Sequence, residues 1–135
     1  MTATSHTRAR LALRFGLGFI WVYEGLVPKL LVPIQQLERD IVAASGLIPN
    51  DFRDPFLHLL GVLEIVLGVL VLAGVWQRQL CVVQFAVIGA FTIVIPFTTP
   101  LAILAHPFGL LTKNVPILGA IVALWFLAES VQQSA

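Results

Sequence analysis

Residues 11–34 read LALRFGLGFIWVYEGLVPKLLVPI, and this run decides the fold class. It is apolar along most of its length and exceeds the roughly 20 residues that a helix needs to cross the hydrocarbon core of a membrane. Three arginines lie before or within its start, as in a signal peptide. The run is too long for one, however, and no clear small-residue cleavage site follows an uninterrupted apolar core. We therefore expect a retained membrane span.

Two charged residues interrupt this run, and each lies four residues before a proline. Pro28 cannot donate a helical hydrogen bond to the carbonyl of Glu24, and Pro33 cannot donate one to the carbonyl of Lys29. A charge beside an unpaired carbonyl is costly in lipid unless polar groups meet both. The pattern therefore predicts that polar side chains from other helices approach this part of the span.

The composition indicates an all-α membrane protein in contact with the lipid bilayer. Hydrophobic residues make up 59% of the chain and charged residues 11%, against roughly 25% charged residues in soluble domains. A net charge of +1 gives no reason to expect a nucleic-acid partner. The single cysteine, Cys81, excludes an internal disulfide and a C-x-x-C redox pair.

The hydropathy pattern predicts a single domain that is a four-transmembrane-helix bundle. The expected spans are residues 11–34, 55–76, 80–99 and 115–132. Residues 77–79 are expected to form the tight turn of an antiparallel hairpin between the second and third spans.

The segment between the first two spans predicts a short amphipathic surface helix. Apolar residues follow helical spacing, polar ones lie elsewhere on the wheel, and Gly46 is a plausible stop. A partly ordered loop remains the alternative. The apolar residues are Ile34, Leu37, Ile41 and Val42, and the polar ones are Gln36, Glu38, Arg39 and Asp40.

Residues 100–114 are apolar but too short and broken to span. We expect them to dip into the membrane under cover of protein, or to rest at its interface. Asn114 is expected to cap the fourth helix, with Pro116 tolerated in its first turn.

Basic residues predict the orientation. Arg8, Arg10 and Arg14 flank the first span, and Arg78 marks the expected turn. Placing both regions in the cytoplasm satisfies the positive-inside rule. Both termini are then cytoplasmic, and the amphipathic helix lies outside.

That topology gathers the candidate ligand-binding residues in the outer half of the bundle. Glu24 and Lys29 are about 140° apart on an ideal helix, so they are not expected to pair with each other. The two glutamates are instead expected to face the two lysines across helices. These charges form either structural ion pairs or a site for a ligand or proton, and both readings stay open. The candidates are Glu24, Lys29, His58, Glu64, Lys113 and Asn114.

No intrinsic cofactor is expected. The sequence shows no metal-ligand cluster and no flavin or nicotinamide fingerprint, and the spacing of His58 and His106 does not indicate a haem.

Small residues indicate where helices pack closely. Gly61, Glu64 and Gly68 share one face of the second span, which aims Glu64 at the bundle interior. Packing roles are also expected for Gly18, Gly25, Ala86, Gly89, Ala90, Gly119 and Ala123.

Three motifs together resemble the DoxX-like family. They are WVYEGLVPKL at residues 21–30, Gly61-x-x-Glu64-x-x-x-Gly68, and Thr112-Lys113-Asn114. The resemblance covers nearly the whole chain and implies a small four-helix bundle in a bacterial cytoplasmic membrane. Its family residues carry over at Glu24, Lys29, Glu64 and Asn114, and no redox-active motif comes with them.

The resemblance also frames three functional hypotheses. The wider DoxX group includes a subunit of a thiosulfate:quinone oxidoreductase, which makes quinone a candidate ligand. The first hypothesis is a non-catalytic anchor or partner of an oxidoreductase. The second is a quinone-linked oxidoreductase subunit with a polar pocket in its outer half. The third is a small-solute or proton conductor. An oxidoreductase or a second copy of the chain is the expected protein partner, and catalysis remains an open question.

Overall fold

The computed structural model describes residues 3–31, 33–100 and 110–132, and all its regular elements there are helical, as predicted. The long helices are α1 (Ala3–Gly25), α3 (Arg53–Ala73), α4 (Gln77–Thr98) and α6 (Leu110–Gln132). The shorter elements are the π-helical turn η1 (Leu26–Leu30), α2 (Gln36–Ser45) and the 3₁₀ turn η2 (Asn50–Phe52).

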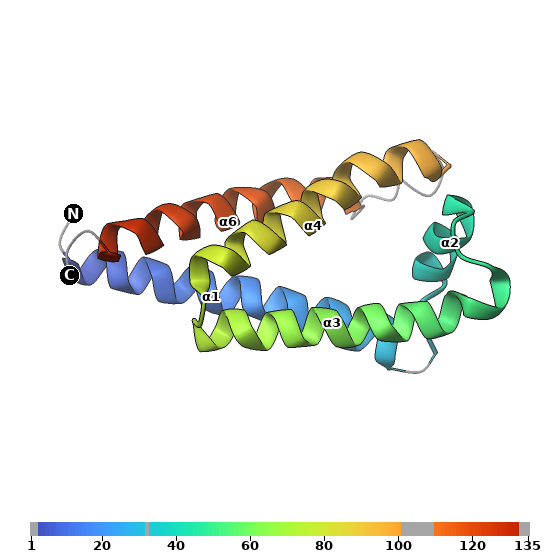
Figure 1. Cartoon of the computed structure of the whole chain (residues 1–135), viewed down its shortest axis with the longest axis horizontal. Coiled ribbons are helices and arrows are strands. Elements are labelled where there is room, and N and C mark those ends of the chain that lie inside the picture. Colours follow the sequence, from blue (N-terminus) through green and yellow to red (C-terminus); the bar gives the residue numbers. More distant parts are fainter. Residues whose placement is uncertain (1–2, 32, 101–109, 133–135) are drawn as a thin grey trace.

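The four long helices run along one direction and form a bundle that is open at one end (Figure 1). α1 packs along α3, and α4 packs along α6. α3 and α4 meet at a tight turn and diverge from it, and α2 lies across the wide opening between them (Figure 1). We call the two ends of the bundle the turn end and the α2 end.

The surface of the bundle is that of a membrane protein. Residues 5–30, 50–73 and 77–98 form three helices long and apolar enough to cross a membrane, and α6 is apolar over Thr112–Ala128. Large apolar side chains face outward from all four long helices, as lipid contact requires. They include Phe19, Leu59, Ile93, Phe97 and Phe126.

Reciprocal glycine contacts hold α1 against α3. A Cβ on Gly68 would lie 2.7 Å from the carbonyl oxygen of Gly18, and one on Gly18 would lie 3.0 Å from that of Gly68. A Cβ on Gly61 would lie 2.7 Å from the carbonyl oxygen of Gly25. The backbones therefore touch at two levels seven residues apart on each helix, which confirms the predicted packing role of these four glycines.

The packing role predicted for two other glycines is wrong. A Cβ on Gly89 or Gly119 would meet nothing within 4 Å. Neither position is a point of close helix approach, because α4 and α6 contact each other through larger side chains such as Ile88 and Ile121.

The first helix starts and ends earlier than predicted. It begins at Ala3, and its last turn is the π-helical η1, closed by a hydrogen bond from the Leu31 N–H to the Leu26 carbonyl. The backbone of Leu31 is extended (ψ 132°), so the helix stops there. Pro33 therefore lies outside the helix, and the prediction that it frees a helical carbonyl at Lys29 is wrong.

The hairpin turn lies at Gly74–Trp76 and not at residues 77–79. Gly74 takes the left-handed conformation (φ 72°) that ends α3, and its N–H donates to the carbonyls of Leu70 and Val71. Gln77 then begins α4.

The predicted amphipathic helix is present as α2. It ends at Gly46, whose φ of 66° confirms the predicted stop. Val42 packs in a small core with Ile34 and Leu57. A two-bond ion pair between Arg39 and Asp54, at 2.8 and 3.0 Å, fastens α2 to the start of α3.

Asn114 is not the cap of the fourth helix. α6 begins at Leu110, which places Asn114 and Pro116 inside the helix. Residues 101–109, including His106, lie outside the described residues, and so does most of the predicted interfacial segment.

Candidate functional site

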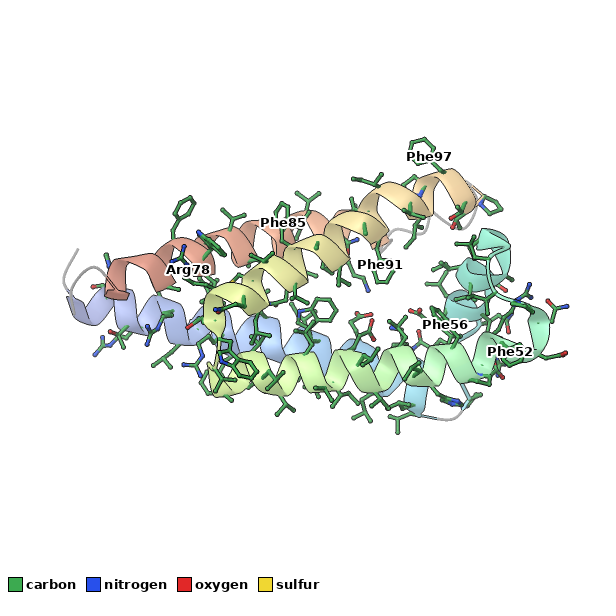
Figure 2. All side chains as sticks on the ribbon, in the orientation of Figure 1. Phe52, Phe56, Arg78, Phe85, Phe91 and Phe97 are labelled. Carbon is green, nitrogen blue, oxygen red and sulfur yellow. The ribbon has the colours of Figure 1, made fainter. Side chains whose placement is uncertain are left out.

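A cavity of about 230 Å³ lies beneath α2, in the opening between α3 and α4. Most of its wall is apolar, and Figure 2 shows Phe56 and Phe91 pointing into the space between the two helices. Charged and polar side chains line another part of the wall. They include Glu24, Lys29, Glu38, Glu64, Lys113 and Asn114.

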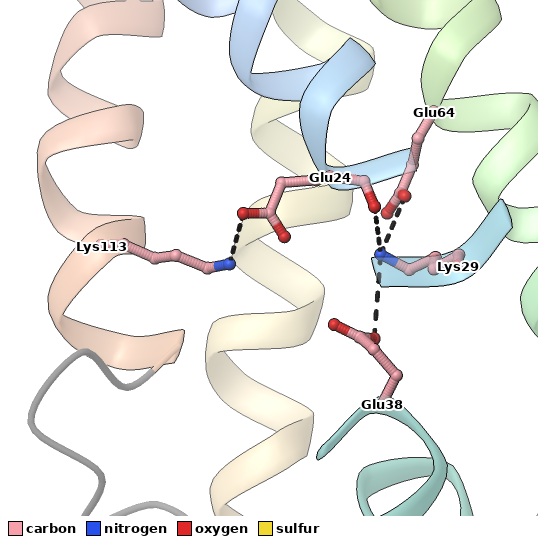
Figure 3. A network of polar contacts seen from close by, with 5 residues as sticks. All are labelled: Glu24, Lys29, Glu38, Glu64 and Lys113. Carbon is pink, nitrogen blue, oxygen red and sulfur yellow. Dashed lines mark hydrogen bonds and ion pairs between the residues drawn. The ribbon is translucent and has the colours of Figure 1, made fainter. Parts of the chain in front are cut away.

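Lys29 is the centre of the charged cluster (Figure 3). Its Nζ lies 2.9 Å from Oε2 of Glu64 and 3.7 Å from Oε2 of Glu38. The contact with Glu64 is an ion pair whose geometry departs from that of a well-aligned hydrogen bond. Lys29 is only 3% exposed and Glu64 7%, so the pair is buried in the protein, and Glu64 faces the interior as predicted.

Lys29 also satisfies the carbonyl that Pro28 leaves free. Its Nζ donates to the backbone oxygen of Glu24 at 2.9 Å (Figure 3). Pro28 lies in η1 and has no N–H to offer that oxygen. The lysine ammonium group therefore replaces the missing helical donor, which is the kind of polar partner that the sequence predicts at this point.

The second ion pair of the cluster is more open. Nζ of Lys113 on α6 lies 2.9 Å from Oε1 of Glu24 on α1, and the two side chains are 37% and 26% exposed. Together, the two short ion pairs confirm the prediction that the glutamates face the lysines across helices.

The cluster contains one more carboxylate than ammonium groups. The carboxylates of Glu38 and Glu64 lie beside Lys29, and the carboxylate of Glu24 lies beside Lys113 (Figure 3). Such a site offers both donors and acceptors to a polar ligand. Within the described ranges, no group of three or more His, Cys, Asp or Glu side chains is arranged to hold a metal ion.

Asn114 joins the cavity wall through hydrogen bonds between helices. It is 3% exposed, and its Nδ2 donates to Oγ1 of Thr92 on α4 at 2.9 Å. Thr92 in turn donates to the carbonyl of Ile88 at 2.7 Å. The bond between Asn114 and Thr92 links α6 to α4 next to the charged cluster.

His58 is the predicted site residue that the structure does not bring into the cavity. It lies on an exposed face of α3 and is not part of the described cavity wall. Glu64 lies six residues later, and the two side chains point to different sides of the helix because six residues turn an ideal helix by about 240°.

Two polar residues were not identified as candidates from the sequence: Glu38 in the cavity wall, and Gln84 in the buried interior of the bundle. Glu38 was assigned to the polar side of the amphipathic helix, yet it lines the cavity together with Ile41, Val42 and Ser45. Their spacing of three, four and seven residues places them on one helical face, and this signal was readable in the sequence. Gln84, which is fully buried, accepts a hydrogen bond from Nε1 of Trp21 at 2.8 Å.

The fold and the site together define a small membrane protein whose described residues form four long helices, with a charged cavity under the short amphipathic helix α2. The chain belongs to the DoxX-like family, whose model matches residues 18–122. That range contains the whole of the charged cluster. No curated protein and no solved structure matches the chain.

Proposed function

We propose that this protein is a non-catalytic membrane subunit of a redox system, and that its cavity binds a quinone head group or a similar small amphiphilic molecule. The observation that carries the proposal is the cavity itself, because apolar walls and a charged wall face the same space. Ligand sites in proteins combine these two features. In this role the protein presents the ligand to a partner oxidoreductase, which supplies the redox chemistry.

The size of the cavity favours a head group over a whole lipid. Its volume of about 230 Å³ is below the range of about 300–1,000 Å³ for pockets that enclose drug-sized ligands. A ring with polar substituents would pack against Phe56 and Phe91, while its apolar tail would leave through the opening between α3 and α4 toward lipid.

The charged wall supplies hydrogen-bond partners for such a ring. Lys113, at 37% exposure, is the more accessible of the two lysines, and its ammonium group would donate to a quinone carbonyl oxygen. The carboxylates of Glu24 and Glu38 would accept from the hydroxyl groups of the reduced form. Lys29 is too enclosed by its three oxygen partners to take part directly.

A purely structural anchor is the second candidate, and one observation favours it. Both lysines of the cluster already have carboxylate partners, so the cluster is electrostatically supported without a ligand. In that case the charges fix the packing of the helices, and the protein stabilises an oxidoreductase without binding a small molecule.

Tryptophan fluorescence distinguishes the two candidates. Trp21 lines the cavity, while Trp76 and Trp125 lie at the turn end. In a Trp76→Phe, Trp125→Phe variant, a short-chain quinone should quench Trp21 in a saturable way. A quinone-free alkyl chain of equal length is the control. Quenching that rises linearly with quinone, as in free lipid, would support the structural anchor instead.

Pro28→Ala provides a second test. Alanine restores an N–H that can donate to the carbonyl of Glu24, in competition with Lys29. If the cavity binds a ligand, straightening the helix here should weaken quinone binding while thermal stability holds or rises. A change in stability or partner association, with no quinone binding in wild type, would support the anchor.

We further propose that the turn end faces the cytoplasm of a bacterial cell. The support is that Arg8, Arg10, Arg14 and Arg78 lie toward this end, where α1 starts and α6 ends (Figure 1). Single cysteines at the exposed Leu47 and Gln79, in a Cys81→Ser background, test it on intact cells. An impermeant thiol reagent should label position 47 only, and labelling of position 79 alone would reverse the orientation.

A further inference from the structure

A second and larger cavity, of about 580 Å³, lies at the turn end. α1 and α6 extend past the turn between α3 and α4 (Figure 1). The cavity lies between this turn and the extended parts of α1 and α6. Arg10 contributes from α1, residues 76–79 from the turn and the start of α4, and Trp125 from α6. At about 1.5 Å per residue, Arg10 is about 21 Å from Glu24 along α1, so this cavity is separate from the one beneath α2.

Several hydrogen-bond donors line this cavity. Arg10 and Arg78 both line it, and the described lining contains no acidic residue. Nε of Arg10 and Nε2 of Gln77 are buried and have no hydrogen-bond partner. Buried donors without partners are uncommon, since each costs free energy, and they point to an acceptor that belongs in the cavity.

The start of α4 adds to this donor set. Gln77 is its first residue, and the side chain of the preceding residue, Trp76, makes no capping hydrogen bond to the helix. The N–H groups of a helix's first turn have no partner within the helix, and the helix dipole favours negative charge there. Gln77, Arg78 and Gln79 of this first turn all line the cavity.

A neighbouring arginine, Arg14, has a structural role at this end. Arg14 donates from Nε to the carbonyl of Val71 at 3.3 Å and from an Nη to that of Leu72, so it caps the C-terminus of α3. The guanidinium carbon of Arg78 lies 4.7 Å from the ring centre of Trp125, which also lines the cavity. The aromatic ring holds this charge at the cavity wall.

We propose that this cavity binds a phosphate group at the membrane surface, carried either by an anionic phospholipid or by a soluble phosphate. Two guanidinium groups and the first turn of a helix match the oxygens of a phosphate group. The exposed Trp76 (71%) and Trp125 suit the interfacial region of a bilayer, where lipid phosphates lie. This site is independent of the function proposed for the cavity beneath α2.

The test measures binding to the purified full-length protein in detergent by the shift in its melting temperature. Phosphatidylglycerol, phosphatidylcholine and inorganic phosphate are titrated separately. Wild type should be stabilised more by phosphatidylglycerol than by phosphatidylcholine. Arg10→Gln and Arg78→Gln should each weaken phosphatidylglycerol binding about tenfold, as expected for the loss of a charge-assisted hydrogen bond to the phosphate group. The effect should also fall as salt is raised.

Arg8→Gln is the matched control, because it removes the same charge from an exposed residue outside the cavity wall. It should leave phosphatidylglycerol binding unchanged. Arg10→Lys and Gln77→Leu guard against a folding defect in the glutamine variants. Arg10→Lys should keep part of the binding, and Gln77→Leu should reduce it without any change in charge.

Each result decides the proposal. Loss of phosphatidylglycerol binding in the cavity variants alone supports a lipid site. Arginine-dependent stabilisation by inorganic phosphate, without a lipid preference, supports the same site with a soluble ligand. Equal effects of Arg8→Gln and Arg10→Gln, or no effect of any phosphate compound, would overturn it.

Discussion

The two lysines of the charged cluster differ in how the protein surrounds them. Lys29 contacts two carboxylates and a backbone carbonyl, and its side chain is 4% exposed. Lys113 contacts Glu24, and its side chain is 37% exposed. One lysine is enclosed by three polypeptide segments, and the other borders open space.

This difference divides the cluster into a structural part and an accessible part. Lys29 joins η1 to α3, reaches toward α2, and replaces the donor that Pro28 lacks. Removing it affects several elements at once. Lys113 joins only α1 and α6, which also pack through apolar contacts among Leu17, Trp21, Ile117 and Ile121. We therefore expect the ammonium group of Lys113 to contribute little to the stability of the fold and to be accessible to a ligand.

The largest expected effect is the loss of Lys29. Lys29→Met leaves Glu64 buried without a cation and the carbonyl of Glu24 without a donor. Breaking a buried pair in this way costs about 3–5 kcal/mol in soluble proteins. We expect a loss of stability of this order, measured by unfolding in a denaturing detergent.

A double-mutant cycle separates pairing from simple truncation. Lys29→Met combined with Glu64→Gln should be less destabilised than the sum of the two single variants, because neither partner is then left charged and alone. Strict additivity of the two effects would show that the pair contributes nothing to the fold.

An intermediate effect is expected where the backbones of α1 and α3 touch. Gly61→Ala places a Cβ against the carbonyl of Gly25, 2.7 Å away, and against Lys29 Cβ at 3.0 Å. Overpacking of this kind costs about 1–3 kcal/mol, and it should also displace Lys29. Gly89→Ala is the control, since its Cβ would meet nothing within 4 Å. The same unfolding measurement should show little change there, and equal losses in both variants would contradict the packing described.

The smallest effect on stability is expected for Lys113. Ion pairs that are partly exposed contribute about 0–1 kcal/mol, so Lys113→Gln should stay within about 1 kcal/mol of wild type. It should nevertheless weaken quinone binding, measured by quenching of Trp21, because it removes the accessible donor. Full binding in this variant would exclude Lys113 from the ligand site.

The presence of the long helices and the pairing of charged side chains across the bundle could be predicted from the sequence. Long apolar runs define membrane helices, and a charge within such a run must find a partner. Glu24 and Glu64 therefore had to meet Lys29 and Lys113. The stop at Gly46 was equally clear, because a glycine that follows an amphipathic helix suits the left-handed conformation.

The rest depended on tertiary geometry or on overlooked local signals. The divergence of α3 from α4 leaves no signature in hydropathy, so the cavity was not foreseen as a space of defined shape. The turn was predicted at the wrong place because the three polar residues Gln77 to Gln79 suggested a loop, whereas Gly74 marks the true end of α3. His58 was grouped with the cluster by depth alone, although its helical face points elsewhere.

The most direct test of the account is photolabelling with a quinone that carries a photoreactive group on its ring. If the cavity beneath α2 binds the head group, adducts should concentrate on cavity residues such as Ile41, Phe56 and Phe91. An excess of unlabelled quinone should suppress them, and Lys113→Gln should reduce them. Adducts spread over outward-facing residues such as Phe19 and Phe97, without suppression by unlabelled quinone, would contradict a binding site in this cavity.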